Sequence, residues 1–279
     1  MKPVDLFVIG AAKSGTTWVD RNLRSCEGVD LPLYKETQFF CGRKKRNIGW
    51  YNSLFNHRNL FRCEVDPAYM VSRDAIDSIY AHNPDAKIVA ILRNPLHRAY
   101  SHFSMVCRGT GNCDQRSLVC PGSRILDDGL YAYWLSKWFE FFPRENVKIF
   151  FYEHVFEEPK AIFNSLSRFV GIDFSPSSDM NEEIHGARPY PKYPAAYRGA
   201  VRAAKVLKKN RLGISIFQAL KNVGFVESLH NWNNGGAPPK FTEDTINLLR
   251  RHYNVELDQL ERLLGENLSS WRRSLESGW

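Results

Sequence analysis

The chain is organised around its N-terminal segment, Val4–Trp18, which reads VDLFVIGAAKSGTTW. Leu6–Ile9 is a short apolar run of mostly branched residues, which predicts a buried strand. Gly10 and Gly15 bound a tight loop, and the residues that follow up to Leu23 are predicted to begin a helix. A strand, a glycine loop and a helix N-terminus direct backbone N–H groups and the positive end of the helix dipole at one point. The segment therefore predicts an anion-binding site.

The spacing of Gly10 and Gly15 matches a P-loop, but the position of the lysine does not. A Walker A loop has its lysine directly after the second glycine, followed by the Ser or Thr that holds Mg²⁺. Here Thr16 follows Gly15, and Lys13 lies two residues before that glycine. The loop is therefore predicted to bind phosphate without the arrangement of an ATPase. The alternative is a glycine turn with a surface lysine.

A second phosphate-binding pattern follows a buried strand predicted over Lys87–Leu92, KIVAIL. Arg93 comes directly after this strand, and a helix is predicted from Pro95 through Ser101. Pro95 suits the first turn of a helix, because its missing N–H group costs nothing there. Arginine offers a planar fork of donors to a phosphate, and the hydroxyl group of Ser101 would supply another donor.

The loop GAAKSGT and the segment RNPLHRAYSHF resemble the nucleotide-binding motifs of sulfotransferases that use 3′-phosphoadenosine 5′-phosphosulfate (PAPS). The loop form G-x-x-K-[SG]-G-T resembles the heparan-sulfate type, the N-deacetylase/N-sulfotransferases and 3-O-sulfotransferases, and their bacterial small-molecule relatives. The resemblance covers nearly the whole chain except Ala200–Leu229. It implies that the 3′-phosphate is bound by Arg93 and Ser101. The residues implied for the 5′-phosphosulfate are Lys13, Ser14, Gly15, Thr16, Thr17 and Trp18.

The segment Gly28–Phe40, GVDLPLYKETQFF, resembles a second signature of this family, in which an acidic residue precedes [HQ]-F-F. By position, Glu36 matches the family's general base. Such a base removes a proton from the acceptor hydroxyl or amine as the acceptor attacks sulfur. The alternative is that Lys35 and Glu36 form an ordinary exposed ion pair.

Acceptor contacts are expected from two further positions. Phe61–Met70, FRCEVDPAYM, resembles the family's E-K-[ST]-P-x-Y pattern, with Asp66 where a hydroxyl residue is common. Asp66 either lies in the acceptor cleft, which would favour a neutral or cationic small molecule, or caps a helix that begins near Val71. His102, on the helix after Arg93, is a candidate acceptor-binding or proton-transfer group.

A loop later in the chain resembles the family's K-G-R-x-Y-P loop, which closes over the nucleotide. It is His185–Pro191, HGARPYP, with His185 in place of the lysine. The resemblance implies that Arg188 contacts the phosphates and that Tyr190 stacks near the adenine. The alternative is a proline-stiffened connection with a surface arginine.

Predicted strands and helices alternate along the chain, which indicates an α/β fold. We expect a central parallel sheet flanked by helices, with a P-loop-like strand-loop-helix core and the nucleotide at the carboxyl ends of the strands. A chain of 279 residues is expected to form a single domain, 1–279, with a helical insertion at about 199–230. The remaining elements predicted are a strand over Asn146–Tyr152, helices over Gly129–Phe142, Glu153–Val170 and Thr242–Leu264, and a long surface loop over Cys107–Arg124.

The composition narrows the partners and the compartment. A net charge of +8, from 38 Lys and Arg against 30 Asp and Glu, suits an anionic ligand. The basic residues are scattered without a nucleic-acid motif, so we expect no nucleic-acid partner. No apolar run approaches the ~20 residues of a membrane span. The N-terminus enters a strand too early for a signal peptide, so we expect no membrane partner and a cytoplasmic enzyme, or a trimmed piece of a longer one.

The six cysteines are too few and too scattered for a disulfide scaffold. Cys113 and Cys120 bracket a loop, and whether they pair depends on the compartment. No Cys and His spacing suggests zinc.

The resemblance implies in-line, metal-independent transfer of a sulfuryl group from PAPS to a hydroxyl or amine, with the bisphosphate PAP as product. Lys13 and the loop N–H groups would stabilise the leaving phosphate, and Glu36 would act as the base. The acceptor is a small molecule or a carbohydrate, and a natural-product alcohol, a sugar, and a guanidinium or amine compound all stay open. The oligomeric state also stays open. The alternatives are a nucleotide or small-molecule kinase with a degenerate P-loop, and a non-catalytic nucleotide- or polyanion-binding module.

Overall fold

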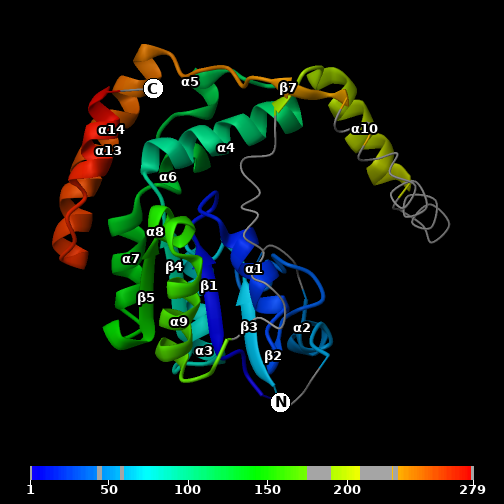
Figure 1. Ribbon diagram of the computed structural model, residues 1–279, viewed down its shortest axis with the longest axis vertical. Coiled ribbons are helices and arrows are strands. Elements are labelled where there is room, and N and C mark those ends of the chain that lie inside the picture. The colour runs from blue at the N-terminus through cyan, green and yellow to red at the C-terminus, as the bar shows by residue number, and fades with distance from the viewer. Residues whose placement is uncertain are drawn as a thin grey trace.

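The computed structural model describes residues 2–42, 46–56, 60–174, 190–207, 228 and 232–277. Within them, five parallel strands form a central sheet in the order β2-β3-β1-β4-β5 (Figure 1). The strands are β1 Leu6–Gly10, β2 Val29–Asp30, β3 Phe61–Val65, β4 Lys87–Leu92 and β5 Val147–Phe151. The predicted α/β fold with a central parallel sheet is therefore confirmed. Because the chain runs from β1 to β3 on one side and then to β4 on the other, β1 lies at the point where the strand order reverses, which is the usual ligand-binding position.

Helices cover both faces of this sheet. Leu6 and Val8 of β1 pack into one buried cluster, and Phe7 and Ile9 pack into another, so both faces of the strand are apolar. This pattern is typical of parallel strands, which are covered on both sides. The first cluster is covered by α1 (Thr16–Arg24), α8 (Tyr152–Glu157) and α9 (Pro159–Val170), and the second by α3 (Arg73–His82) and α7 (Tyr131–Phe139).

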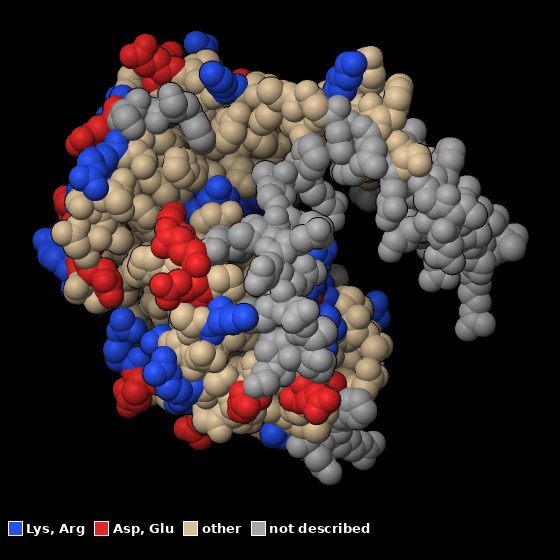
Figure 2. Space-filling view, viewed as in Figure 1, with Lys and Arg blue, Asp and Glu red and all other residues tan. Residues whose placement is uncertain are grey.

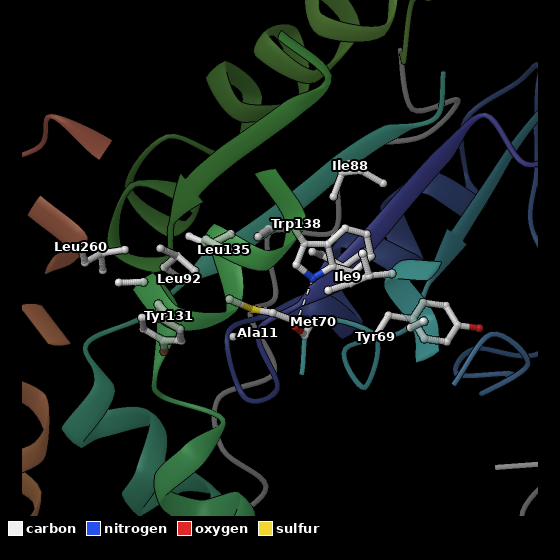
Figure 3. Close-up of a cluster of buried hydrophobic side chains, with 14 of the residues drawn as sticks. Ile9, Ala11, Tyr69, Met70, Ile88, Leu92, Tyr131, Leu135, Trp138 and Leu260 are labelled. Carbon is white, nitrogen blue, oxygen red and sulfur yellow. Dashed lines mark hydrogen bonds between the residues drawn. The ribbon is translucent and has the colours of Figure 1, made fainter. Parts of the chain in front are cut away.

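The loop after β1 begins over a closely packed part of the core. Gly10 lies against Met70, and a Cβ atom built on Gly10 would lie 2.8 Å from the Met70 Cβ atom. The Met70 carbonyl oxygen accepts a hydrogen bond of 3.1 Å from the indole Nε1 of Trp138, which fixes this backbone from α7 (Figure 3). Glycine is favoured at position 10 because the side chain of Met70 occupies the space that a Cβ atom would need.

Helix α4 (Pro95–Thr110) crosses beyond the carboxyl ends of the strands (Figure 1). The side chain of Asn94 caps it by accepting hydrogen bonds from the backbone N–H groups of Leu96 and His97, at 3.0 and 3.4 Å. Gly111 ends the helix in a left-handed conformation, with φ of 80°. The helix predicted through Ser101 is therefore present and continues for more than two further turns.

The C-terminal part of the chain packs against α4 and α7. The helix predicted over Thr242–Leu264 is present as α13 (Glu243–Leu264), with Thr242 as its N-cap residue. Helix α14 (Ser269–Ser277) follows it. A two-stranded antiparallel sheet is formed by β6 (Tyr190–Pro191) and β7 (Asn234–Gly236). It lies near the C-terminal end of α4 (Figure 1). The other elements are α2 (Ile48–Asn52), α5 (Gln115–Leu118), α6 (Arg124–Asp127), η1 (Arg144–Asn146) and α10 (Pro194–Leu207).

Two predicted elements were wrong in part. The surface loop expected over Cys107–Arg124 contains the end of α4 and the short helix α5. The helix expected over Glu153–Val170 is divided into α8 and α9 at Glu158, because Pro159 has no N–H group to continue the first helix. Most of the segment 200–229 lies outside the described residues beyond the end of α10.

The charged side chains of the two signs are mixed on the surface: Lys and Arg are interspersed with Asp and Glu over the face shown in Figure 2. No helix in the described part of the chain combines the length and the apolar character that a membrane crossing needs. All six cysteines are free, so Cys113 and Cys120 are not paired in this structure.

We expect Gly10→Ala to destabilise the protein by about 1–3 kcal/mol, because the added Cβ atom overpacks the contact with Met70. Gly199→Ala is the matched control. Gly199 lies in α10, and outside its own helix backbone no atom of the described residues comes within 4 Å of its would-be Cβ, so this change is expected to stabilise slightly through helix propensity. Urea denaturation of the two variants measures both effects, and equal midpoints would contradict the packing argument.

Candidate active site

The loop between β1 and α1 has the features of an anion site. Lys13 and Gly15 both have left-handed backbone conformations, with φ of 74° and 83°. Helix α1 begins after Gly15 with no side-chain cap and no acidic residue in its first turn. Ser14 is fully buried, and among the described residues its Oγ atom has no hydrogen-bond partner. A buried hydroxyl group without a partner costs free energy, so this loop fits a bound phosphate that would satisfy it.

Arg93 joins this loop to the end of β4. Its Nη1 atom donates a hydrogen bond of 3.1 Å to the carbonyl oxygen of Lys13. Its guanidinium group also lies over the ring of Tyr152, 4.3 Å from the ring centroid, and Tyr131 donates a hydrogen bond to its carbonyl oxygen. The two segments that the sequence assigns to opposite phosphates of one nucleotide are therefore in direct contact.

Helix α4 approaches the same loop from the other side. The Nζ atom of Lys13 lies 3.7 Å from the Sδ atom of Met105. Ser101 precedes Met105 by four residues, so both side chains lie on the same face of α4. Ser101, half-buried, is one turn closer to Arg93 on this face. The helix thus presents the Ser101 hydroxyl group on the side that faces the loop.

The side chain of Lys35 links Glu36 to the start of α1. The Lys35 Nζ atom is 2.5 Å from Oε1 of Glu36 and 3.4 Å from Oγ1 of Thr16. The Lys35 side chain is only 16% exposed, whereas that of Glu36 is 45% exposed. The ion pair considered as an alternative is present, but it is not an ordinary surface pair, because Lys35 is largely buried against α1.

The backbone around Glu36 is held in an unusual conformation by the end of β3. Glu36 and Gln38 have φ of 63° and 55°, in the left-handed region that costs free energy for residues other than glycine. The carboxylate of Asp66 accepts hydrogen bonds from the N–H groups of Gln38 (2.7 Å) and Ala68 (3.0 Å). Between them, Thr37 donates to the carboxylate of Glu64 at 2.5 Å. Two buried carboxylates thus fix the loop that presents Glu36.

Glu64 is fully buried and accepts three hydroxyl groups. Tyr51 and Tyr69 donate to it at 2.5 and 3.0 Å, in addition to Thr37. Burial raises the pKa of Glu64 to about 7, and these hydrogen bonds oppose the rise. The sequence patterns give no role to this cluster, although a glutamate within an otherwise largely apolar strand is unusual enough to mark it.

The position of Asp66 differs from both expectations. Asp66 is fully buried and bonded to the backbone, so its carboxylate does not line an open acceptor cleft, and burial raises its pKa. It also does not cap the following helix, because Ser72 caps α3 by accepting a hydrogen bond from the N–H group of Ala75. Its place in the structure is to hold Gln38.

Trp18 and His102 are also more buried than expected. The Trp18 ring packs edge-on against Phe163 in the core, 5.5 Å between centroids, so its side chain is a core residue. His102 is nearly buried, with Nδ1 3.4 Å from a guanidinium nitrogen of Arg98 and 3.8 Å from a carboxylate oxygen of Asp128. Burial and the charge of Arg98 lower the pKa of His102 to about 3, so the ring is neutral at physiological pH.

The nucleotide-closing loop is described only at its end. Arg188 lies outside the described residues. Tyr190 begins β6, and its hydroxyl group is 3.9 Å from the Sγ atom of Cys113, just beyond the end of α4. Burial and this thiol raise the pKa of Tyr190 to about 12. In the part of the chain that the structure describes, no group of three or more His, Cys, Asp or Glu side chains is placed to hold a metal ion.

Comparison with known proteins assigns the family. Residues 3–187 match the model of the sulfotransferase domain, so the chain belongs to this family and is a transferase. The human heparan sulfate glucosamine 3-O-sulfotransferase 6 is 28% identical over 177 residues, which cover 60% of this chain and 52% of that protein. The bifunctional heparan sulfate N-deacetylase/N-sulfotransferase 1 of Caenorhabditis briggsae is 26% identical over 213 residues, which cover 63% and 25%.

The chain therefore spans about a quarter to a half of the length of these relatives. Among solved structures, a sulfotransferase from Alicyclobacillus acidocaldarius has the same fold, with a TM-score of 0.69. The match covers 98% of this chain and 100% of that one at 20% identity. The resemblance inferred from the nucleotide-binding motifs is confirmed at the level of family and fold.

Glu64 makes the stability of the protein depend on pH. Its pKa is raised from 4.5 to about 7 in the fold, so the folded protein holds this proton more tightly than the unfolded chain. Stability from this group is therefore full below about pH 4.5 and is lost as the pH rises to 7. We expect the free energy of unfolding of the wild type, relative to Glu64→Gln, to fall by roughly 3 kcal/mol across this range. Urea denaturation at a series of pH values measures it, and a difference that is constant with pH would refute the assignment.

Proposed function

We propose that the protein transfers a sulfuryl group from PAPS to a hydroxyl or amine group of an acceptor and releases PAP. The observation that carries this proposal is the hydrogen bond between Arg93 and the carbonyl oxygen of Lys13. It joins a helix N-terminus that suits one phosphate to a guanidinium group that suits another. One adenosine nucleotide with phosphates at both ends of its ribose fits such a pair of sites.

The residues around the loop divide between the two ends of the nucleotide. We assign the 5′ end to the loop, which carries Lys13, the buried hydroxyl group of Ser14 and the first N–H groups of α1. We assign the 3′-phosphate to Arg93 and Ser101. Gly15 allows the tight turn, and the hydroxyl groups of Thr16 and Thr17 stand at the start of the helix. Arg188 and Tyr190 stay proposed contacts of the nucleotide-closing loop.

Bound PAPS supplies the sulfuryl group, and the protein supplies charge and a base. The positive charge of Lys13 and the N–H groups at the start of α1 stabilise negative charge on the leaving phosphate. Glu36, on the exposed side of its loop, accepts the proton of the acceptor. We propose that this transfer needs no metal, because protein cations stand around the loop.

The acceptor is proposed to be a carbohydrate or another small molecule. The relatives named above carry heparan sulfate in their names, which supports a carbohydrate. The resemblance of the loop motif to bacterial small-molecule sulfotransferases supports a natural product. His102 of α4 stays a proposed acceptor contact, and because its pKa is lowered to about 3 it would act as a neutral hydrogen-bonding group. The six free cysteines support a reducing compartment such as the cytoplasm.

We expect Lys13→Ala and Arg93→Ala each to weaken PAP binding at least about tenfold, because each removes a charge-assisted contact to a phosphate. Lys13→Ala is also expected to abolish sulfate transfer while the protein stays folded. Arg21→Ala, at an exposed position of α1, is the control with unchanged affinity. Isothermal titration calorimetry measures the affinities, and wild-type affinity in either variant would remove that residue from the site.

We expect Glu36→Gln to bind PAP at least as tightly as the wild type and to lose about 100-fold or more of its turnover, because the base is removed. Transfer of labelled sulfate from PAPS to acceptor pools measures the turnover. Unchanged turnover would remove Glu36 from the mechanism. Mg²⁺-dependent use of ATP in the same assay would favour the kinase alternative, and PAP binding without any transfer would favour a binding module.

A further inference from the structure

Lys35 connects the nucleotide loop to the candidate base. Its ammonium group contacts the hydroxyl group of Thr16, the first residue of α1, and the carboxylate of Glu36. Its side chain is 16% exposed, so the ammonium group is held in place rather than free in solvent.

The position of Lys35 is electrostatically unfavourable without a neighbouring anion. The N-terminus of a helix carries a partial positive charge, so a cation next to it is destabilised and an anion is stabilised. Glu36 provides that anion here, at 2.5 Å, from a backbone held in the left-handed region by Asp66 and Glu64. A phosphate bound at the same helix N-terminus would provide a second anion within reach of the same ammonium group.

We propose that Lys35 is a positioning residue that is shared between Glu36 and the 5′ phosphate group, so that nucleotide binding releases the base. Without nucleotide, the ion pair holds Glu36 at the loop and neutralises it. When a phosphate binds at the start of α1, Lys35 turns towards the phosphate. Glu36 is then free to accept the proton of the acceptor. This inference rests on the proposed function, and it places nucleotide binding before acceptor activation.

The proposal predicts a specific coupling between two substitutions. Glu36→Gln should tighten PAP binding about threefold to tenfold, because binding no longer has to break the ion pair. Lys35→Met should weaken PAP binding about tenfold, because it removes a cation from the phosphate site. In the double variant, Glu36→Gln should no longer tighten binding, because no lysine is left to release. Lys35→Arg, which keeps the charge, should retain most of the affinity of the wild type.

Calorimetry with PAP on the four proteins of this cycle provides the test, with thermal unfolding to verify that each is folded. Tightening by Glu36→Gln that persists or grows in the Lys35→Met background would overturn the proposal, because it would reflect general repulsion between Glu36 and the nucleotide. Wild-type affinity in Lys35→Met would overturn it as well. If the proposed function itself is wrong, calorimetry gives a different result, because the wild type would then not bind PAP.

Discussion

The contact between the Arg93 guanidinium group and the Lys13 carbonyl oxygen is the interaction on which the site depends. It is possible because β1 and β4 are adjacent parallel strands, so the segments that follow them leave the sheet at the same edge. Met70, which Trp138 holds by a hydrogen bond, packs against Gly10 at the start of the loop. Asn94 caps the start of α4 directly after Arg93. The buried core thus sets the separation between the two proposed phosphate positions.

The opposite side of the site is built by the end of β3. Glu64 and Asp66 are buried carboxylates, which is costly unless their oxygens are hydrogen-bonded, and here they hold Thr37 and Gln38. The free energy that these contacts contribute offsets the left-handed conformations of Glu36 and Gln38. Lys35 then links this strained loop to α1. The candidate base and the phosphate loop come from separate strands and are joined by side chains rather than by chain proximity.

The sequence predicted the central fold well because the relevant patterns are local. The apolar runs at Leu6–Ile9 and Lys87–Leu92 are strands, and the glycine loop and the Pro95 helix start lie where the motifs placed them. Strand β2 was not predicted, because two residues are too few to show an alternating pattern. The break before Pro159 was predictable from the proline itself.

Side-chain burial was harder to predict than secondary structure. Asp66 and Trp18 belong to motifs that suggest ligand contacts, yet tertiary packing turns both inward. Lys35 appears in the sequence as a surface lysine beside an acid, and only the approach of α1 shows that it contacts Thr16. The shared environment of Thr37, Tyr51, Glu64 and Tyr69 depends on three separate segments. The segment Phe61–Met70 supplies Glu64 and Tyr69, but nothing in it indicates that Thr37 and Tyr51 join them.

The most direct test of this account is a crystal structure of the protein with PAP. The account predicts one nucleotide with its 5′-phosphate at the loop between Gly10 and Gly15, and with its 3′-phosphate bonded to Arg93 and Ser101. A nucleotide that reaches only one of these two positions, or that binds elsewhere on the protein, would contradict it.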